Sequence, residues 1–384
     1  MVNRVRQQPR LAAAVGLVVI VVASSIVRIA LNSNATGAWI FADELIYSEL
    51  ARTAFSGFSI RGVPVSGYGS IYPLIIAPAY LIGDLVTAYR VAQATNAIVM
   101  SLTAIPVYLT ARLLVDRRWA LVAAALSVAI PAMTYTSVIM TESAFYPIFA
   151  LSVYVAVTAI ATGSYWRQAL MVPLTILAFE TRQQGVAIFP AYALALAVFA
   201  ILELVCAATG SRKRVLASLG RRFWMSVLLI LGGVVGVIGV QAVRGKSLSS
   251  LLGAYQILAQ GAVGNEFRPR VTAAVFVQHI AEMALWLGFI PIIALVVLVA
   301  FAVRSTSTRE MRAFAATAVS FVLVMTAVVA AFAVFTNIGR IEERNLFYVG
   351  YLALIALVWW AAASLPRQPR VLAVACVAVV TVAA

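Results

Sequence analysis

Acidic residues beside apolar segments are the first candidates for chemistry in this sequence. Asp43 and Glu44 follow the first apolar segment, and Glu142 lies between two apolar segments separated by only a few residues. A carboxylate that close to a bilayer is costly unless it is paired or faces a wet cavity, where it could act as a base. Two structural alternatives stay open, because Asp43 is a preferred helix N-cap residue and Glu142 could be a solvated turn residue.

Arginine residues lie at the ends of the same apolar segments. The guanidinium group is a rigid fork that matches phosphate oxygens, so several arginines at one membrane depth could hold a lipid-linked phosphate. The candidates are Arg90, Arg182, Arg340 and Arg344, with Arg268, Arg270 and His279 in a second polar region. The alternative is internal pairing, for example of Arg182 with Glu180 or Glu142. Residue chemistry alone leaves both open.

The composition shows which elements must position these side chains. Of the 384 residues, 64% are hydrophobic and only 11% are charged. A soluble domain carries about 25% charged residues, and a single water-soluble core could not bury so much apolar surface. Apolar runs of the length that crosses a bilayer recur instead, and inside lipid they must be helices. The sequence therefore predicts an all-α polytopic membrane protein and excludes a soluble globular enzyme.

The apolar runs predict about ten or eleven transmembrane helices. The predicted spans are 11–31, 88–113, 119–140, 144–162, 166–180, 185–206, 223–243, 280–303, 313–336 and 346–365, with an incomplete last span over 371–384. The apolar stretch 71–83 is too short to cross and contains Pro73 and Pro78, so it predicts a dipping or interfacial segment. We expect residues 1–384 to form a single membrane domain.

Basic residues predict the orientation of the chain. Most of the 28 Lys and Arg residues fall at the N-terminus and in alternate short loops, which predicts a cytoplasmic N-terminus. Two longer loops, 32–87 and 244–279, then lie on the outer face. Because the net charge of +15 is explained as an orientation signal, no nucleic-acid partner is needed. The inner loops are too short for a soluble catalytic domain, and no phosphate-binding glycine motif follows a strand pattern.

The first outer loop predicts a helix that lies in the membrane interface. Ile46, Leu50 and Ala54 recur at the spacing of one helix face. Asp43 would then lie at the N-terminus of this helix, where the helix dipole stabilises a carboxylate.

Several short motifs together resemble a known family, the polyprenyl-phosphate-dependent GT-C glycosyltransferases. Within that superfamily, the sequence is similar to the protein mannosyltransferase and aminoarabinose transferase group and the bacterial proteins around it. The resemblance covers roughly residues 10–360. It is carried by Ala42-Asp43-Glu44-Leu-Ile-Tyr47, Ser70-Ile-Tyr72-Pro73, Arg182-Gln183-Gln184-Gly185 and Glu343-Arg344-Asn345-Leu-Phe347-Tyr348. Asn345 stands where a Tyr is more usual.

The resemblance implies a reaction at the outer face of the plasma membrane. A sugar, a hexose or a pentose, would move from polyprenyl phosphate to a hydroxyl group of a glycan, lipid or protein acceptor, with inversion. The resemblance makes Asp43 the general base, accompanied by Glu44 and Glu142. It assigns the donor phosphate to Arg182, Arg344, Arg340 and Arg90, and it implies a substrate pocket that contains Tyr47, Tyr72, Gln183 and His279.

The sequence predicts no cofactor for this reaction. Few carboxylates are available for a metal, so a divalent cation is possible without being obligatory. The expected partners are the lipid-linked sugar, the acceptor and membrane lipids. A multi-pass transporter or lipid flippase is the alternative function, because intramembrane charges also mark transport pathways. We see neither the internal repeat typical of transporters nor charges at the membrane midplane.

Overall fold

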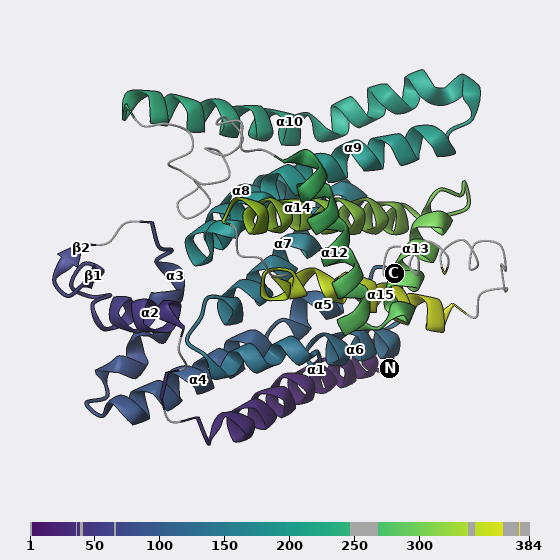
Figure 1. Cartoon of the computed structure of the whole chain (residues 1–384). Helices are drawn as coiled ribbons and strands as arrows, with labels where there is room; N and C mark the ends of the chain where they lie inside the picture. Colours follow the sequence, from purple (N-terminus) through teal and green to yellow (C-terminus); the bar gives the residue numbers. More distant parts are fainter. Residues whose placement is uncertain are drawn as a thin grey trace. The chain divides into compact units, whose positions relative to one another are not determined.

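The computed structural model describes residues 2–35, 37–38, 41–64, 67–245, 268–336, 342–363 and 376 (Figure 1). These residues form two compact units, which are described separately. The first unit contains Met1–Leu151 and Leu177–Gly185, and the second contains Ser152–Ile176 and Val186–Ala384.

The first unit is built mainly from helices. Its elements are α1 (Val2–Asn32), α2 (Ala42–Arg52), β1 (Ser59–Ile60), β2 (Val63–Pro64), α3 (Ile71–Ile76), η1 (Ala77–Leu81), α4 (Leu85–Ser101), α5 (Ala104–Ala111), α6 (Arg117–Ser127) and η2 (Pro131–Ser137). Two longer helices, α7 (Glu142–Thr162) and α8 (Tyr165–Thr181), each belong partly to both units, and η3 (Gln183–Ala187) follows them.

The second unit contains the remaining helices. They are α9 (Ile188–Cys206), η4 (Thr209–Ser211), α10 (Arg212–Val243), α12 (Pro269–Leu287), α13 (Phe289–Ala302), α14 (Arg309–Phe335), η6 (Glu343–Asn345), η7 (Phe347–Val349) and α15 (Gly350–Ala362). Within this unit α14 packs along α9 and α12, and α13 packs against α15. An ion pair of 2.7 Å between Arg312 and Glu203 joins α14 to α9.

Six helical segments of the described residues are long and apolar enough to cross a membrane, and the number rises to eight if each of two bent helix pairs is one span. The bent pairs are α6 with η2 and α12 with α13. The sequence predicts about ten or eleven spans, and the difference has a structural reason. Helices α8 and α15 have only 17 and 13 residues, and the predicted last span over 371–384 lies outside the described residues, apart from Cys376.

The face of α1 is typical of a helix in lipid. Leu11, Val18 and Ile26 are 60–68% exposed, although they are strongly apolar. The other side of α1 packs against α4 and α6, and Figure 1 shows α1 and α4 side by side. A hydrogen bond of 2.9 Å from Ser101 to Ser24 joins the two helices. This packing holds α4, which carries part of the candidate site, against α1.

The first polar loop is largely structured. Helix α2 is the predicted interfacial helix, and α3 with η1 takes the place of the predicted dipping segment. The hairpin β1–β2 is not among the predicted elements; its strands pair antiparallel, with Ser59 opposite Pro64. Its turn residues Arg61 and Gly62 both have positive φ, at 51° and 79°, as the tightest hairpin turns require.

Candidate functional site

Asp43 lies in the first turn of α2 and is half-buried. It is not the N-cap residue, because that position is taken by Phe41, which has extended backbone angles and makes no side-chain cap. The carboxylate of Asp43 therefore lies near the positive end of the helix dipole without closing the helix. Asp43 is therefore not the N-cap of α2, although the helix dipole still stabilises a carboxylate in this first turn.

Glu142 and Arg182 form an ion pair in the first unit. A guanidinium nitrogen of Arg182 lies 3.2 Å from Oε1 of Glu142. The same nitrogen donates a hydrogen bond of 2.7 Å to the hydroxyl group of Thr141, and Nε of Arg182 donates one of 3.3 Å to Gln184. The Glu142 side chain is only 1% exposed, so the pair fixes the Arg182 side chain in one orientation.

Tyr47 connects Asp43 with this ion pair. Burial raises the pKa of Tyr47; the Arg182 charge opposes this effect, while the charges of Glu142 and Asp43 add to it. All three charged groups therefore lie within electrostatic reach of one phenol. Like an ordinary tyrosine, Tyr47 is neutral at pH 7, and the raised pKa keeps it so at higher pH; its hydroxyl group can therefore donate a hydrogen bond.

Aromatic rings support Tyr47 from two sides. Its ring meets Tyr68 edge-on at 5.9 Å and Tyr72 at 5.4 Å between centroids. Tyr72 is fully buried, and its hydroxyl group donates a hydrogen bond of 3.2 Å to Asn96 on α4. Burial raises the pKa of Tyr72 well above its usual value. Tyr72 thus holds the Tyr47 ring in place, with its own polar group directed to Asn96.

Glu44 has different neighbours from Asp43. It is fully buried, and its Oε1 accepts a hydrogen bond of 2.7 Å from Tyr89 and one of 2.9 Å from the backbone N–H of Ile139. These contacts tie α2 to α4 and to the segment before α7. Glu44 therefore positions the helix that carries Asp43.

The segment after α8 holds the loop before α3. The Gln183 side chain donates a hydrogen bond to the carbonyl group of Gly67, and the Ser70 hydroxyl group donates one of 3.1 Å to Glu180. A β-carbon at Gly69 would collide with the carbonyl group of Glu180, so only glycine allows this close approach. These contacts place Gln183 and Arg182 beside the loop that contributes Tyr68.

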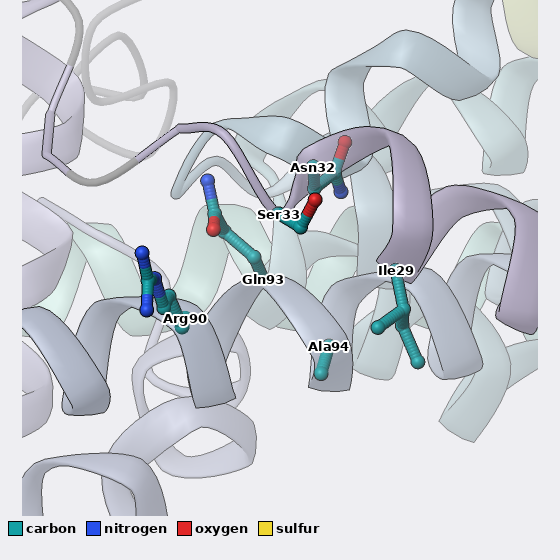
Figure 2. A pocket seen from close by; sticks show the side chains of 6 residues that line it. All are labelled: Ile29, Asn32, Ser33, Arg90, Gln93 and Ala94. Carbon is teal, nitrogen blue, oxygen red and sulfur yellow. The ribbon is translucent and has the colours of Figure 1, made fainter.

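Arg90 lies in a separate set of contacts. It is exposed on α4 and lines a hollow together with Ile29, Asn32, Ser33, Gln93 and Ala94, as Figure 2 shows. The residue before it, Tyr89, points instead to Glu44.

The remaining predicted residues belong to the second unit. His279 is buried in α12; its Nε2 accepts a hydrogen bond of 3.1 Å from the backbone N–H of Glu342, so Nδ1 carries the proton that it shares with the carbonyl group of Val275. Arg344 lies in η6, and Asn345 donates a hydrogen bond of 3.0 Å to Glu342. Arg340 lies outside the described residues.

Sequence reasoning missed some partners of the candidate site. Thr141 and Gln184 orient Arg182, and Tyr68 packs on Tyr47. In the sequence, only their closeness to predicted site residues indicates that these three residues belong to the site. Within the described part of the chain, no group of three or more His, Cys, Asp or Glu residues is arranged to hold a metal ion.

Comparisons with known proteins identify the fold. No family model matches the sequence, and no curated protein matches it. Among solved structures, the chain is similar to the archaeal oligosaccharyltransferase AglB from Archaeoglobus fulgidus, solved in complex with an inhibitory peptide and a dolichol-phosphate. The TM-score is 0.58 at 13% sequence identity, and the match covers 98% of this chain and 55% of that one. The predicted all-α, polytopic, GT-C-like fold is thereby confirmed.

Proposed function

We propose that this chain is an integral membrane glycosyltransferase that moves a sugar from a polyprenyl phosphate donor to an acceptor hydroxyl group. The observation that carries the proposal is the cluster of Asp43, Tyr47, Glu142 and Arg182 in the first unit. The fold likeness to an oligosaccharyltransferase solved with a dolichol-phosphate supports the class of reaction and of donor.

In the proposed reaction Asp43 is the general base. It takes the proton of the acceptor hydroxyl group as that oxygen bonds to the anomeric carbon of the sugar. The bond from this carbon to the phosphate oxygen breaks at the same time, and its electron pair leaves with the lipid phosphate. One displacement inverts the anomeric configuration, and a carboxylate is basic enough because the proton is lost late in the step.

The leaving phosphate needs positive charge and hydrogen bonds instead of a general acid. Arg182 supplies a guanidinium group whose direction is fixed by Glu142 and Thr141. Tyr47 supplies a neutral hydroxyl donor beside it. The roles of Arg344, Arg340 and His279 remain predictions from the sequence resemblance. Arg90, which the resemblance also assigns to the donor phosphate, lines a separate hollow, and we leave it out of the proposed donor site.

The wider assignments follow from the same proposal. We place the site on the outer face of the plasma membrane, with the N-terminus in the cytoplasm, because of the distribution of basic residues. The donor sugar is a hexose or a pentose, the acceptor is a glycan, lipid or protein, and no divalent cation is obligatory.

Proteoliposomes that contain the purified protein test this function against transport. Polyprenyl-phosphoryl mannose and arabinose, labelled in the sugar, are supplied with alkyl glycosides, glycans and hydroxyl-bearing peptides as acceptors. We expect labelled glycoside to form together with free polyprenyl phosphate. Movement of the labelled lipid between leaflets without any glycoside would overturn the proposal and favour a flippase.

A further inference from the structure

A hollow of about 170 Å³ lies between the end of α1 and the start of α4 (Figure 2). Asn32 is the last residue of the first candidate span, and Arg90 lies in the first turns of the span that begins at Leu85. The hollow is therefore located where the chain leaves the apolar zone and enters it again, at the depth of lipid headgroups. The hollow lies at headgroup depth whether this end of the two spans faces the cytoplasm or the outside.

The hollow combines one cation with several hydrogen-bond acceptors. Arg90 is exposed, and among the described residues it makes no ion pair within 4.0 Å; the carboxylate of Asp84 lies within its electrostatic reach. Gln93 and Asn32 use their amide nitrogens elsewhere, donating to the carbonyl group of Ser137 at 2.7 Å and to Thr136 at 3.2 Å. Ser33 donates its hydroxyl proton to the carbonyl group of Ala30. Each of these three side chains thus keeps an oxygen that can accept a hydrogen bond.

An apolar strip continues from the hollow along both helices. Ile29 and Ala94 form its apolar side. One turn further into the apolar zone, Ile26 on α1 and Ile98 on α4 are 61% and 48% exposed. A ligand with a polar head in the hollow could lay a hydrocarbon chain along this strip.

We propose that the hollow binds the headgroup of an anionic membrane phospholipid, at a site separate from the sugar-transfer site. The phosphodiester pairs with Arg90, and hydroxyl groups of a glycerol headgroup donate to the oxygens of Asn32, Ser33 and Gln93. A polyprenyl phosphate shares the phosphate and the apolar chain. It has no hydroxyl groups that could donate to these three oxygens, so the phospholipid can make more hydrogen bonds in the hollow.

Native mass spectrometry of the purified full chain can test the site. The probes are phosphatidylglycerol, phosphatidylcholine of the same acyl chains, and a polyprenyl phosphate. We expect one phosphatidylglycerol molecule to bind at least tenfold more tightly than phosphatidylcholine. Arg90→Gln removes the cation and Ala94→Leu fills the hollow while leaving Arg90 in place, and each variant should abolish that preference.

Arg118→Gln is the matched control, because Arg118 is another exposed arginine of the first unit, at the start of α6. It should keep the wild-type preference, since Arg118 does not line the hollow. Equal loss in Arg118→Gln, or no loss in Ala94→Leu, would mean that the lipid binds by surface charge alone and would overturn the proposal. Displacement of phosphatidylglycerol by an equimolar polyprenyl phosphate would also overturn it, because the hollow would then belong to the donor.

Discussion

At the scale of single residues, the main result concerns Arg182 and Glu142. The sequence left two roles open for Arg182, phosphate binding and internal pairing, and the structure contains the internal pair. The two roles are compatible, because a guanidinium group held on one side by Glu142 and Thr141 is oriented for a ligand on another. The sequence could not decide this, since residues 142 and 182 are far apart in the sequence and meet only in the folded chain.

Breaking this pair from one side should be strongly destabilising. Arg182→Gln leaves the carboxylate of Glu142 buried without its counter-charge, which costs about 3 kcal/mol or more for buried pairs. The double variant Glu142→Gln/Arg182→Gln removes both charges and should recover part of that loss. Thermal unfolding in detergent measures both variants. Arg52→Gln breaks an exposed pair with Glu49 and serves as the control with little change; a double variant no more stable than Arg182→Gln would contradict the account.

Neutralising Glu44 should affect glycosyl transfer far less than neutralising Asp43, although the two residues are neighbours in the sequence. Glu44→Gln keeps an acceptor for Tyr89 and for the N–H of Ile139, so we expect folding and glycosyl transfer to be largely retained. Glu44→Ala leaves the backbone N–H of Ile139 buried without its partner, at a cost of about 1–3 kcal/mol, and leaves the Tyr89 hydroxyl group only the carbonyl group of Ser137, 3.4 Å away. Unfolding temperature and turnover of the two variants check this. Loss of turnover in Glu44→Gln with normal stability would assign Glu44 to the chemistry instead.

At the scale of elements, the structure contains helices at both predicted positions, α2 for the interfacial helix and α3 with η1 for the dipping segment, while their place in the membrane stays a prediction. The sequence placed Asp43 at the helix N-terminus correctly but could not show that Phe41 is the N-cap. The hairpin β1–β2 was missed because its strands are only two residues long and give no alternating pattern. Within the sequence, only the glycines of this loop, such as Gly62 in the turn, indicate a hairpin.

The loop before α3 should tolerate no side chain at Gly69. Gly69→Ala would push the loop away from the Glu180 carbonyl group and with it Tyr68 from Tyr47, so turnover should fall about tenfold or more. Gly83→Ala is the control, because a β-carbon there meets nothing within 4 Å. Steady-state kinetics of both variants check this, and equal activity would mean that the loop does not shape the site.

The start of α4 depends on the charge of Asp84. Hydrogen bonds from Thr87 lower the pKa of Asp84, which caps α4 with its carboxylate. Because the pKa of Asp84 is lowered in the folded state, its charged carboxylate stabilises the fold at pH values above the usual Asp pKa. This contribution is lost as the pH falls through the pKa of the folded state. Asp84→Asn should therefore melt at a lower temperature than the wild type at pH 7, and the difference should shrink as the pH falls below the usual Asp pKa. A difference that grows on acidification would contradict this sign.

At the scale of the whole molecule, the class of fold follows from the sequence because apolar length and low charge are physical requirements of a bilayer. The number of spans was harder to predict from the sequence than the class of fold. Bends of 54° between α6 and η2 and 113° between α12 and α13 interrupt apolar runs that read as continuous. The breaks fall at Pro131, the first residue of η2, and at Gly288, which lies between α12 and α13 with a positive φ of 81°. A window of mean hydropathy averages over such single residues, so it does not detect these bends.

The central claim is that Asp43 accepts the proton of the acceptor during sugar transfer. The most direct test is the rate of polyprenyl-phosphate release by Asp43→Asn at saturating donor, with the donor dissociation constant measured on the same sample. Glu49→Gln, a change of the same kind on the same helix, is the control. We predict a rate at least about 100-fold below the wild type for Asp43→Asn with nearly unchanged donor binding, and a normal rate for Glu49→Gln. A rate for Asp43→Asn within about threefold of the wild type would contradict the account.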